Sequence, residues 1–213
     1  MTRTSSVEIG AGTVAMEGVL ALPPDAIGMV LFAHGSGSSR LSPRNNHVAA
    51  ALREAGIGAL LPDLLTPDED LDHAQRFDIG MLAERLGGAA AWLGTAPLTA
   101  PLSLGLFGAS TGAAALRLAA RDGSGSAAVV SRGGRPDQAD EAALSAVITP
   151  TLLIVRGDDA AALELNRQAL AALRCEKELA IVPGASHLFE EPGTLEDVAG
   201  LARDWFMRHF GTV

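Results

Sequence analysis

The sequence has 213 residues, of which 48% are apolar and 19% charged, and this balance indicates a folded chain with a substantial core. Its net charge of −9 argues against a nucleic-acid-binding surface, which needs clustered lysine and arginine, and disfavours anionic membranes. The only cysteine is Cys175, which excludes an intrachain disulfide and a cysteine-based metal cluster, and no apolar run reaches the ~18 residues of a membrane-spanning helix.

Short apolar runs alternate with helical patterns along the chain. Strand-like runs occupy residues 14–22, 28–34, 57–65, 102–110, 126–134, 151–159 and 177–185. Helical patterns occupy residues 45–55, 77–93, 111–121, 162–173 and 194–210. This alternation predicts an α/β fold with a doubly wound, mostly parallel sheet flanked by helices. The first run alternates more strongly between apolar and polar residues, which indicates an antiparallel edge strand.

No repeat, low-complexity tract or charged linker divides the sequence, so we expect a single domain over residues 1–213. The connection between the runs at 126–134 and 151–159 is too short for a cap domain. The first 18 residues lack the apolar segment of a signal peptide. We therefore expect a cytoplasmic protein, a monomer or a homodimer.

The loop HGSGSS follows the run at 28–34 and begins at His34. Its partial G-x-G, with Asp63 after the next strand, resembles part of a dinucleotide-binding fingerprint. Arg40 stands at the third glycine position, however, and Pro43 follows closely. A dinucleotide site is therefore disfavoured, and the sequence predicts no organic cofactor and no metal.

A single serine, Ser110, lies where an apolar strand passes into an alanine-rich helix. Residues 108–112 read GASTG, which fits the G-x-S-x-G pattern of a nucleophile on a sharp strand-to-helix turn. Small residues on both sides let such a turn form without clashes. The alternative is a serine that merely occupies a turn. No Gly-Lys-Ser/Thr follows, which excludes a P-loop.

A serine nucleophile needs a base, and His187 is the best-placed of five histidines. It lies in a loop between the last strand and the last helix, at the end of the sheet where ligands bind. The alternative is a loop histidine bonded to backbone. The other histidines favour structural or solvated roles: His34, His47, His73 and His209.

A third group must orient the base, and two adjacent aspartates, Asp158 and Asp159, end the strand run at 151–159. They lie between Ser110 and His187 in the sequence, which is the order of serine, acid and histidine in α/β-hydrolases. Asp63 is a competing carboxylate, but it precedes the serine. Physical reasoning from the sequence leaves the choice between the adjacent aspartates open.

Stabilising an oxyanion needs two backbone N–H donors. The amide of Thr111, directly after the serine, is one candidate. The glycine-rich loop at residues 34–39 offers the amide of Ser36 as the second, with His34 holding the loop in place.

Two arginines near these motifs are candidates for binding a substrate carboxylate: Arg40 and Arg132. For Arg132, and for Arg135 beside it, the alternative is an ion pair with Asp137 or Asp140.

Together, GASTG, HGSGSS, RGDD and GASH resemble the motifs of an α/β-hydrolase, and more narrowly of the small, lidless branch related to dienelactone hydrolases. The resemblance extends from about residue 14 to residue 210. It implies that Ser110 is the nucleophile and His187 the base. Similar sequences read roughly LLIVGGxDxxVIxLN where this chain reads LLIVRGDDAAALELN, which places the acid at Asp159.

The chain departs from that family in two places. Dienelactone hydrolases use a cysteine nucleophile, whereas Ser110 stands here, which favours ordinary ester hydrolysis over the dienelactone reaction. An alanine run at 160–162 replaces the valine often found after the acid. The resulting prediction is a serine hydrolase acting on a small-molecule ester, thioester or lactone. The alternatives are acyl transfer, carbon–carbon bond cleavage, or a non-catalytic binding protein on the same scaffold.

Overall fold

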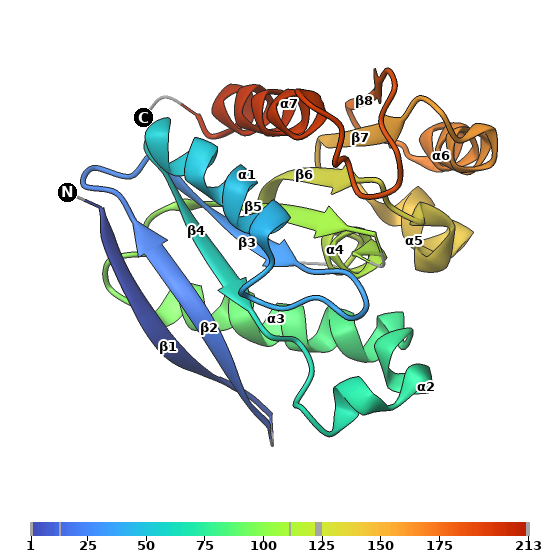
Figure 1. Ribbon diagram of the computed structural model, residues 1–213. Helices are drawn as coiled ribbons and strands as arrows, with labels where there is room; N and C mark the ends of the chain where they lie inside the picture. Colours follow the sequence, from blue (N-terminus) through green and yellow to red (C-terminus); the bar gives the residue numbers. More distant parts are fainter. Residues whose placement is uncertain (1, 13, 111, 122–124, 212–213) are drawn as a thin grey trace.

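The structure, a computed structural model, describes residues 2–12, 14–110, 112–121 and 125–211. An eight-stranded sheet has the strand order β1-β2-β4-β3-β5-β6-β7-β8 (Figure 1). Its strands are β1 (Arg3–Ala11), β2 (Val14–Leu22), β3 (Gly28–Ala33), β4 (Ile57–Pro62), β5 (Ser103–Ala109), β6 (Ser126–Arg132), β7 (Thr151–Arg156) and β8 (Lys177–Val182). The pairs β1–β2 and β2–β4 are antiparallel, and the strands from β4 to β8 are parallel.

Helices cover both faces of this sheet. The α-helices are α1 (Pro43–Glu54), α2 (His73–Arg76), α3 (Ile79–Thr95), α4 (Ala113–Ala119), α5 (Glu141–Ala146), α6 (Ala160–Ala172) and α7 (Thr194–His209). Two short 3-10 helices are η1 (Glu69–Leu71) and η2 (Pro136–Ala139). Helices α1 and α7 lie on one face and α3 on the opposite one (Figure 1). Among the described residues, no helix has the length and hydropathy needed to cross a membrane.

Alternation along the central strands divides the core into two layers. On β3, Val30 and Phe32 pack in the layer under α1 and α7, whereas Leu31 and Ala33 pack in the layer with α3 and α4. Every residue of β3 is buried, as expected for a strand covered on both faces. This double burial explains the continuous apolar runs in the sequence.

The structure confirms the predicted doubly wound, mostly parallel α/β fold, and the described residues contain no cap domain. One expectation is only half right: the run at 14–22 is antiparallel to both its neighbours, as predicted, but it lies second in the sheet as β2, and β1 forms the edge. Of the side chains described on β1, only that of Ile9 is buried. An exposed edge strand carries little apolar pattern, so β1 left no clear trace in the sequence.

The strand order reverses around β3, which pairs with β4 on one side and β5 on the other. Sheets of this kind bind ligands where the order reverses, beyond the carboxyl ends of the strands. The loop beginning at His34 follows β3, and Ser110 follows β5. The fold therefore brings these two segments to the same point.

Candidate active site

Ser110 adopts a strained backbone between β5 and α4. Its φ of 53° lies in the left-handed region, which is rare for a residue with a side chain. A Cβ on Gly108 would overlap the carbonyl oxygen of Gly112, and a Cβ on Gly112 would overlap the backbone nitrogen of Ala109. The two glycines of GASTG are thus required by a close approach of strand and helix, as predicted from the motif.

Backbone hydrogen bonds hold Ser110 in this conformation. Its N–H donates to the carbonyl of Arg132 at 3.2 Å, and its own carbonyl accepts from the N–H of Arg135 at 3.2 Å. Both partners lie at or beyond the carboxyl end of β6. The serine is therefore fixed by the neighbouring strand, which is how a protein maintains a strained residue.

The loop after β3 lies against Ser110. A Cβ on Gly35 would come within 2.9 Å of the Ser110 Cβ, so glycine is needed for this approach. His34 holds the loop as predicted, because its Nε2 accepts a hydrogen bond from the N–H of Leu64 at 3.1 Å and its Nδ1 lies 3.1 Å from the Gly35 carbonyl. Thr111, the other predicted oxyanion donor, lies outside the described residues.

A small pocket of about 80 Å³ gathers four of the predicted site residues: Ser36, Ser110, Arg132 and His187. These residues come from loops after β3, β5 and β8 and from the end of β6. Within the described part of the chain, no hydrogen bond joins the Ser110 hydroxyl to His187. The pocket therefore brings the predicted nucleophile and base together without a bond between them.

Arg132 is a buried cation at the wall of this pocket, with 6% of its surface exposed. Its Nη2 donates to Asn45 Oδ1 at 3.1 Å, its guanidinium carbon lies 5.5 Å from the centre of the Phe189 ring, and its Nε has no hydrogen-bond partner. Burial, and secondarily the charge of Arg44, lower its pKa to about 10, so it remains charged at neutral pH. Among the described residues, no carboxylate forms an ion pair with it.

The ion pairing considered for these arginines is only half right. Arg135 does pair with Asp137, at 2.7 Å from Nη2 to Oδ2, but Asp140 pairs with Arg117 at 2.9 Å. The prediction of a carboxylate partner for Arg132 is wrong, because β6 points its side chain inward toward the pocket.

Asp159 lies near His187, but an arginine stands between them. Arg156, the last residue of β7, donates from Nε to Asp159 Oδ2 at 2.9 Å, and its Nη2 bonds the same oxygen. Its Nη1 lies 3.0 Å from His187 Nδ1. The other carboxylate oxygen of Asp159 accepts the N–H of Ala162 at 2.8 Å and caps helix α6. Asp158, the alternative acid, is exposed.

The charges around His187 are mainly positive. Burial lowers its pKa most, followed by the cations Arg156, Arg132 and Arg44, whereas Asp159 acts weakly in the opposite direction. The pKa of Asp159 is itself lowered, first by the N–H of Ala162 and then by Arg156. A neutral imidazole in a basic surrounding is the resting state that these groups favour.

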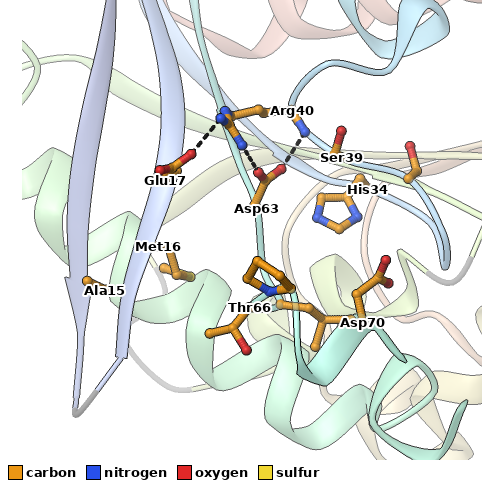
Figure 2. Close-up of a pocket in the computed structure, with 12 residues that line it drawn as sticks. Ala15, Met16, Glu17, His34, Ser39, Arg40, Asp63, Thr66 and Asp70 are labelled. Atoms are coloured by element: carbon orange, nitrogen blue, oxygen red, sulfur yellow. Dashed lines mark hydrogen bonds and ion pairs between the residues drawn. The ribbon is translucent and has the colours of Figure 1, made fainter. Parts of the chain in front are cut away.

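Arg40 lies in a separate pocket of about 340 Å³ next to the first (Figure 2). Its backbone N–H donates to Asp63 Oδ1 at 2.6 Å, its Nη1 bonds Asp63 Oδ2, and its Nη2 lies 2.5 Å from Glu17. Ser38 lines both pockets. The guanidinium of Arg40 is thus engaged by two carboxylates of its own chain, away from Ser110.

Sequence reasoning missed three site residues: Arg44, Asn45 and Arg156. The first two lie on α1 and face the pocket from a helix that carries no motif. Arg156 had a signal, since it occupies a position where similar sequences carry glycine in LLIVGG. An arginine in that position brings a positive charge next to Asp159, the predicted acid.

No protein-family model matches this sequence. The chain is 52% identical to a dienelactone hydrolase from Anabaena variabilis, whose crystal structure superposes with a TM-score of 0.94 and 98% coverage of both chains. A lidless α/β serine hydrolase from Xanthomonas campestris shares the fold at 21% identity, with a TM-score of 0.79 and coverage of 99% of this chain and 97% of the other.

Curated relatives from Mycobacterium tuberculosis carry a provisional phosphoribosyl transferase name. They are 54% identical over 208 residues, which is 97% of this chain and 47% of theirs. The chain therefore spans about half the length of these relatives. Their name describes a protein about twice as long.

Proposed function

Because the chain belongs to the dienelactone hydrolase-like branch of the α/β-hydrolases, we propose that it is a serine hydrolase that cleaves a carboxylic ester, thioester or lactone. The observation that carries this proposal is the strained Ser110, with φ of 53°, in one pocket with His187. Strained backbone clusters at active sites, which supports a chemical role for Ser110.

In the proposed reaction, Ser110 Oγ attacks the substrate carbonyl carbon while His187 Nε2 takes its proton. The tetrahedral intermediate then expels the alcohol, thiol or ring oxygen, which receives that proton from His187. Water, activated by the same histidine, hydrolyses the acyl-enzyme. Asp159 is proposed to orient His187 and to stabilise its charged form.

The backbone amides of Ser36 and Thr111 are proposed as the oxyanion donors. The close approach of Gly35 to Ser110, and the presence of Ser36 and Ser110 in one pocket, support the first. The position directly after the nucleophile supports the second. This chemistry requires no metal and no organic cofactor.

We further propose that the substrate carries an anionic group that binds Arg132. A buried guanidinium without a carboxylate partner among the described residues retains its capacity to bind one. Arg44 lines the same pocket and adds positive charge; among the described residues, its ion-pair partner is the exposed Glu190, at 3.4 Å. The paired Arg40 is less suited to this role.

We do not extend the phosphoribosyl transferase name of the longer relatives to this chain. The residues gathered around Ser110 favour acyl chemistry, and the chain matches 47% of the length of those relatives. Acyl transfer to an alcohol remains the second candidate function on the same residues.

A panel of 4-nitrophenyl esters with increasing acyl length tests the proposal. We expect release of 4-nitrophenol together with free acid. Adding an alcohol acceptor separates the two candidates, because a transferase would form a new ester at the expense of the acid. Absence of turnover for every ester and thioester would contradict a hydrolase function.

A further inference from the structure

Arg156 contacts both the proposed acid and the proposed base. Its Nε and Nη2 hold Asp159 Oδ2, while Nη1 lies 3.0 Å from His187 Nδ1. The Arg156 side chain is 15% exposed, whereas Asp159 is 32% exposed. The guanidinium is therefore packed between the two groups and is part of the site.

These contacts determine where the proton of His187 resides. A guanidinium has only N–H donors and stays protonated in proteins, so His187 Nδ1 must accept the hydrogen bond from Arg156. A neutral imidazole that accepts at Nδ1 carries its proton at Nε2.

That tautomer is the opposite of the one that the proposed reaction needs. A base for Ser110 must have a free lone pair at Nε2 and a proton at Nδ1 that donates a hydrogen bond to the acid. With Arg156 in its observed position, His187 has no lone pair at Nε2.

We propose that Arg156 is a positioning residue that holds His187 in a resting tautomer, so that the chemical step requires Nη1 of Arg156 to leave Nδ1 of His187. The same movement withdraws Nε and Nη2 of Arg156 from Asp159 Oδ2, which then accepts a hydrogen bond from Nδ1–H of His187. The imidazole loses a proton at Nε2 and gains one at Nδ1 through solvent, with its net charge unchanged. This inference rests on the proposed function of Ser110 and His187.

The other charged groups facing His187 do not compensate for Arg156. Arg132 approaches from the end of β6 and Arg44 from α1, and both are cations. Among the described residues, Asp159 at the start of α6 is the anion that raises the pKa of His187, and its effect is smaller than that of the cations. Removing Arg156 therefore removes a cation and frees Asp159 to act as the counter-charge.

The tautomer is measured directly by long-range ¹H–¹⁵N spectra of the protein with ¹⁵N-labelled histidine at pH 8. The His187 signals are assigned by their loss in His187→Gln. We expect the Nε2–H form for His187 in the unmodified protein and a change toward Nδ1–H in Arg156→Gln, whose amide oxygen accepts an N–H. A predominant Nδ1–H form in the unmodified protein would overturn the inference, and this result needs no variant at position 156.

Kinetics provide the second readout. With a neutral 4-nitrophenyl ester at pH 8, Arg156→Gln should raise kcat/KM about three- to tenfold. Because a cation beside His187 is lost, the acidic limb of the pH profile of kcat/KM should move up by about one pH unit. Arg156→Lys keeps the charge and a donor, so it should raise kcat/KM less. Arg203→Gln removes an exposed arginine on α7 as the charge control and should leave kcat/KM unchanged. Equal activity of the Gln and Lys variants, or a loss in Arg156→Gln, contradicts the proposal.

The two proposals fail in different ways. If no ester is turned over, the proposed function fails, while the spectra still report the tautomer that Arg156 imposes. If esters are turned over and His187 already carries Nδ1–H, only the inference about Arg156 fails.

Discussion

Two neighbouring pockets at the same edge of the sheet contain arginines, and Arg40 in one pocket differs in its partners from Arg132 in the other. Arg40 is held by Asp63 and Glu17 (Figure 2). Arg132 is more deeply buried, bonds a neutral asparagine and has an unpartnered Nε. A cation neutralised within its own chain stabilises a loop, whereas a buried cation without a counter-charge among the described residues is available for an anionic ligand.

The largest expected effect is on the pocket that contains Ser110. Ser110→Ala should lower kcat/KM for activated esters about 10⁴-fold, because the nucleophile is lost while binding groups remain. Circular dichroism should show an unchanged fold. If Ser110→Ala were as active as the unmodified protein, Ser110 would not be the nucleophile. The pocket of Arg40 would then be the next candidate for the active site.

The next effect separates the two arginines. Arg132→Met should lower kcat/KM for 4-nitrophenyl hemiglutarate, which carries a carboxylate, about 10- to 100-fold relative to the neutral 4-nitrophenyl valerate. Arg40→Met serves as the control and should leave the ratio of the two substrates within about twofold. If Arg132→Met and Arg40→Met changed the ratio of kcat/KM for the two substrates equally, Arg132 would have no special role in binding the anionic substrate.

Arg40 should instead matter for stability. Arg40→Met leaves Asp63, whose side chain is 19% exposed, without its cation, and we expect a loss of about 1–2 kcal/mol in the free energy of unfolding. Glu17 is 70% exposed, so Glu17→Gln should cost less than about 0.5 kcal/mol. Denaturant unfolding of both variants measures the difference in the free energy of unfolding. If Arg40→Met unfolds with the same free energy as the unmodified protein, the ion pairs of Arg40 do not stabilise the fold.

The smallest effect concerns pH. Burial first, and then the cations around His187, lower the pKa of this proposed base. Because a base must be neutral to act, we expect His187 to stay active to lower pH than an ordinary histidine. The acidic limb of kcat/KM should therefore have its midpoint below the ordinary histidine value of 6.5. A midpoint above 6.5 in the unmodified protein would mean that Asp159, not the cations, dominates the field at the base.

The sequence predicted those features of the pockets that depend on local backbone and burial patterns. The fold followed from apolar strands buried on both faces, and Ser110 followed from glycines that only a tight turn requires. The motif could not reveal that β6 buries Arg132 without a carboxylate. That property depends on which side chains surround the end of a strand.

The position of Arg156 illustrates the same limit. The order of Ser110, Asp159 and His187 along the chain predicts which residues meet, but not what lies between them. Arg156, three residues before the proposed acid, reaches the same space, and we propose that the hydrogen bonds of its planar guanidinium decide the tautomer of the proposed base. The contacts of Arg156 can therefore be read only from the arrangement of side chains in the structure.

The central claim, that Ser110 is a reactive nucleophile, is tested most directly by labelling the protein with a fluorophosphonate and locating the adduct by peptide mass spectrometry. The account predicts one adduct, on Ser110, that is absent from Ser110→Ala and strongly reduced in His187→Gln. A protein that remains unlabelled at Ser110 while fully folded, or that carries the adduct on another residue, would contradict it.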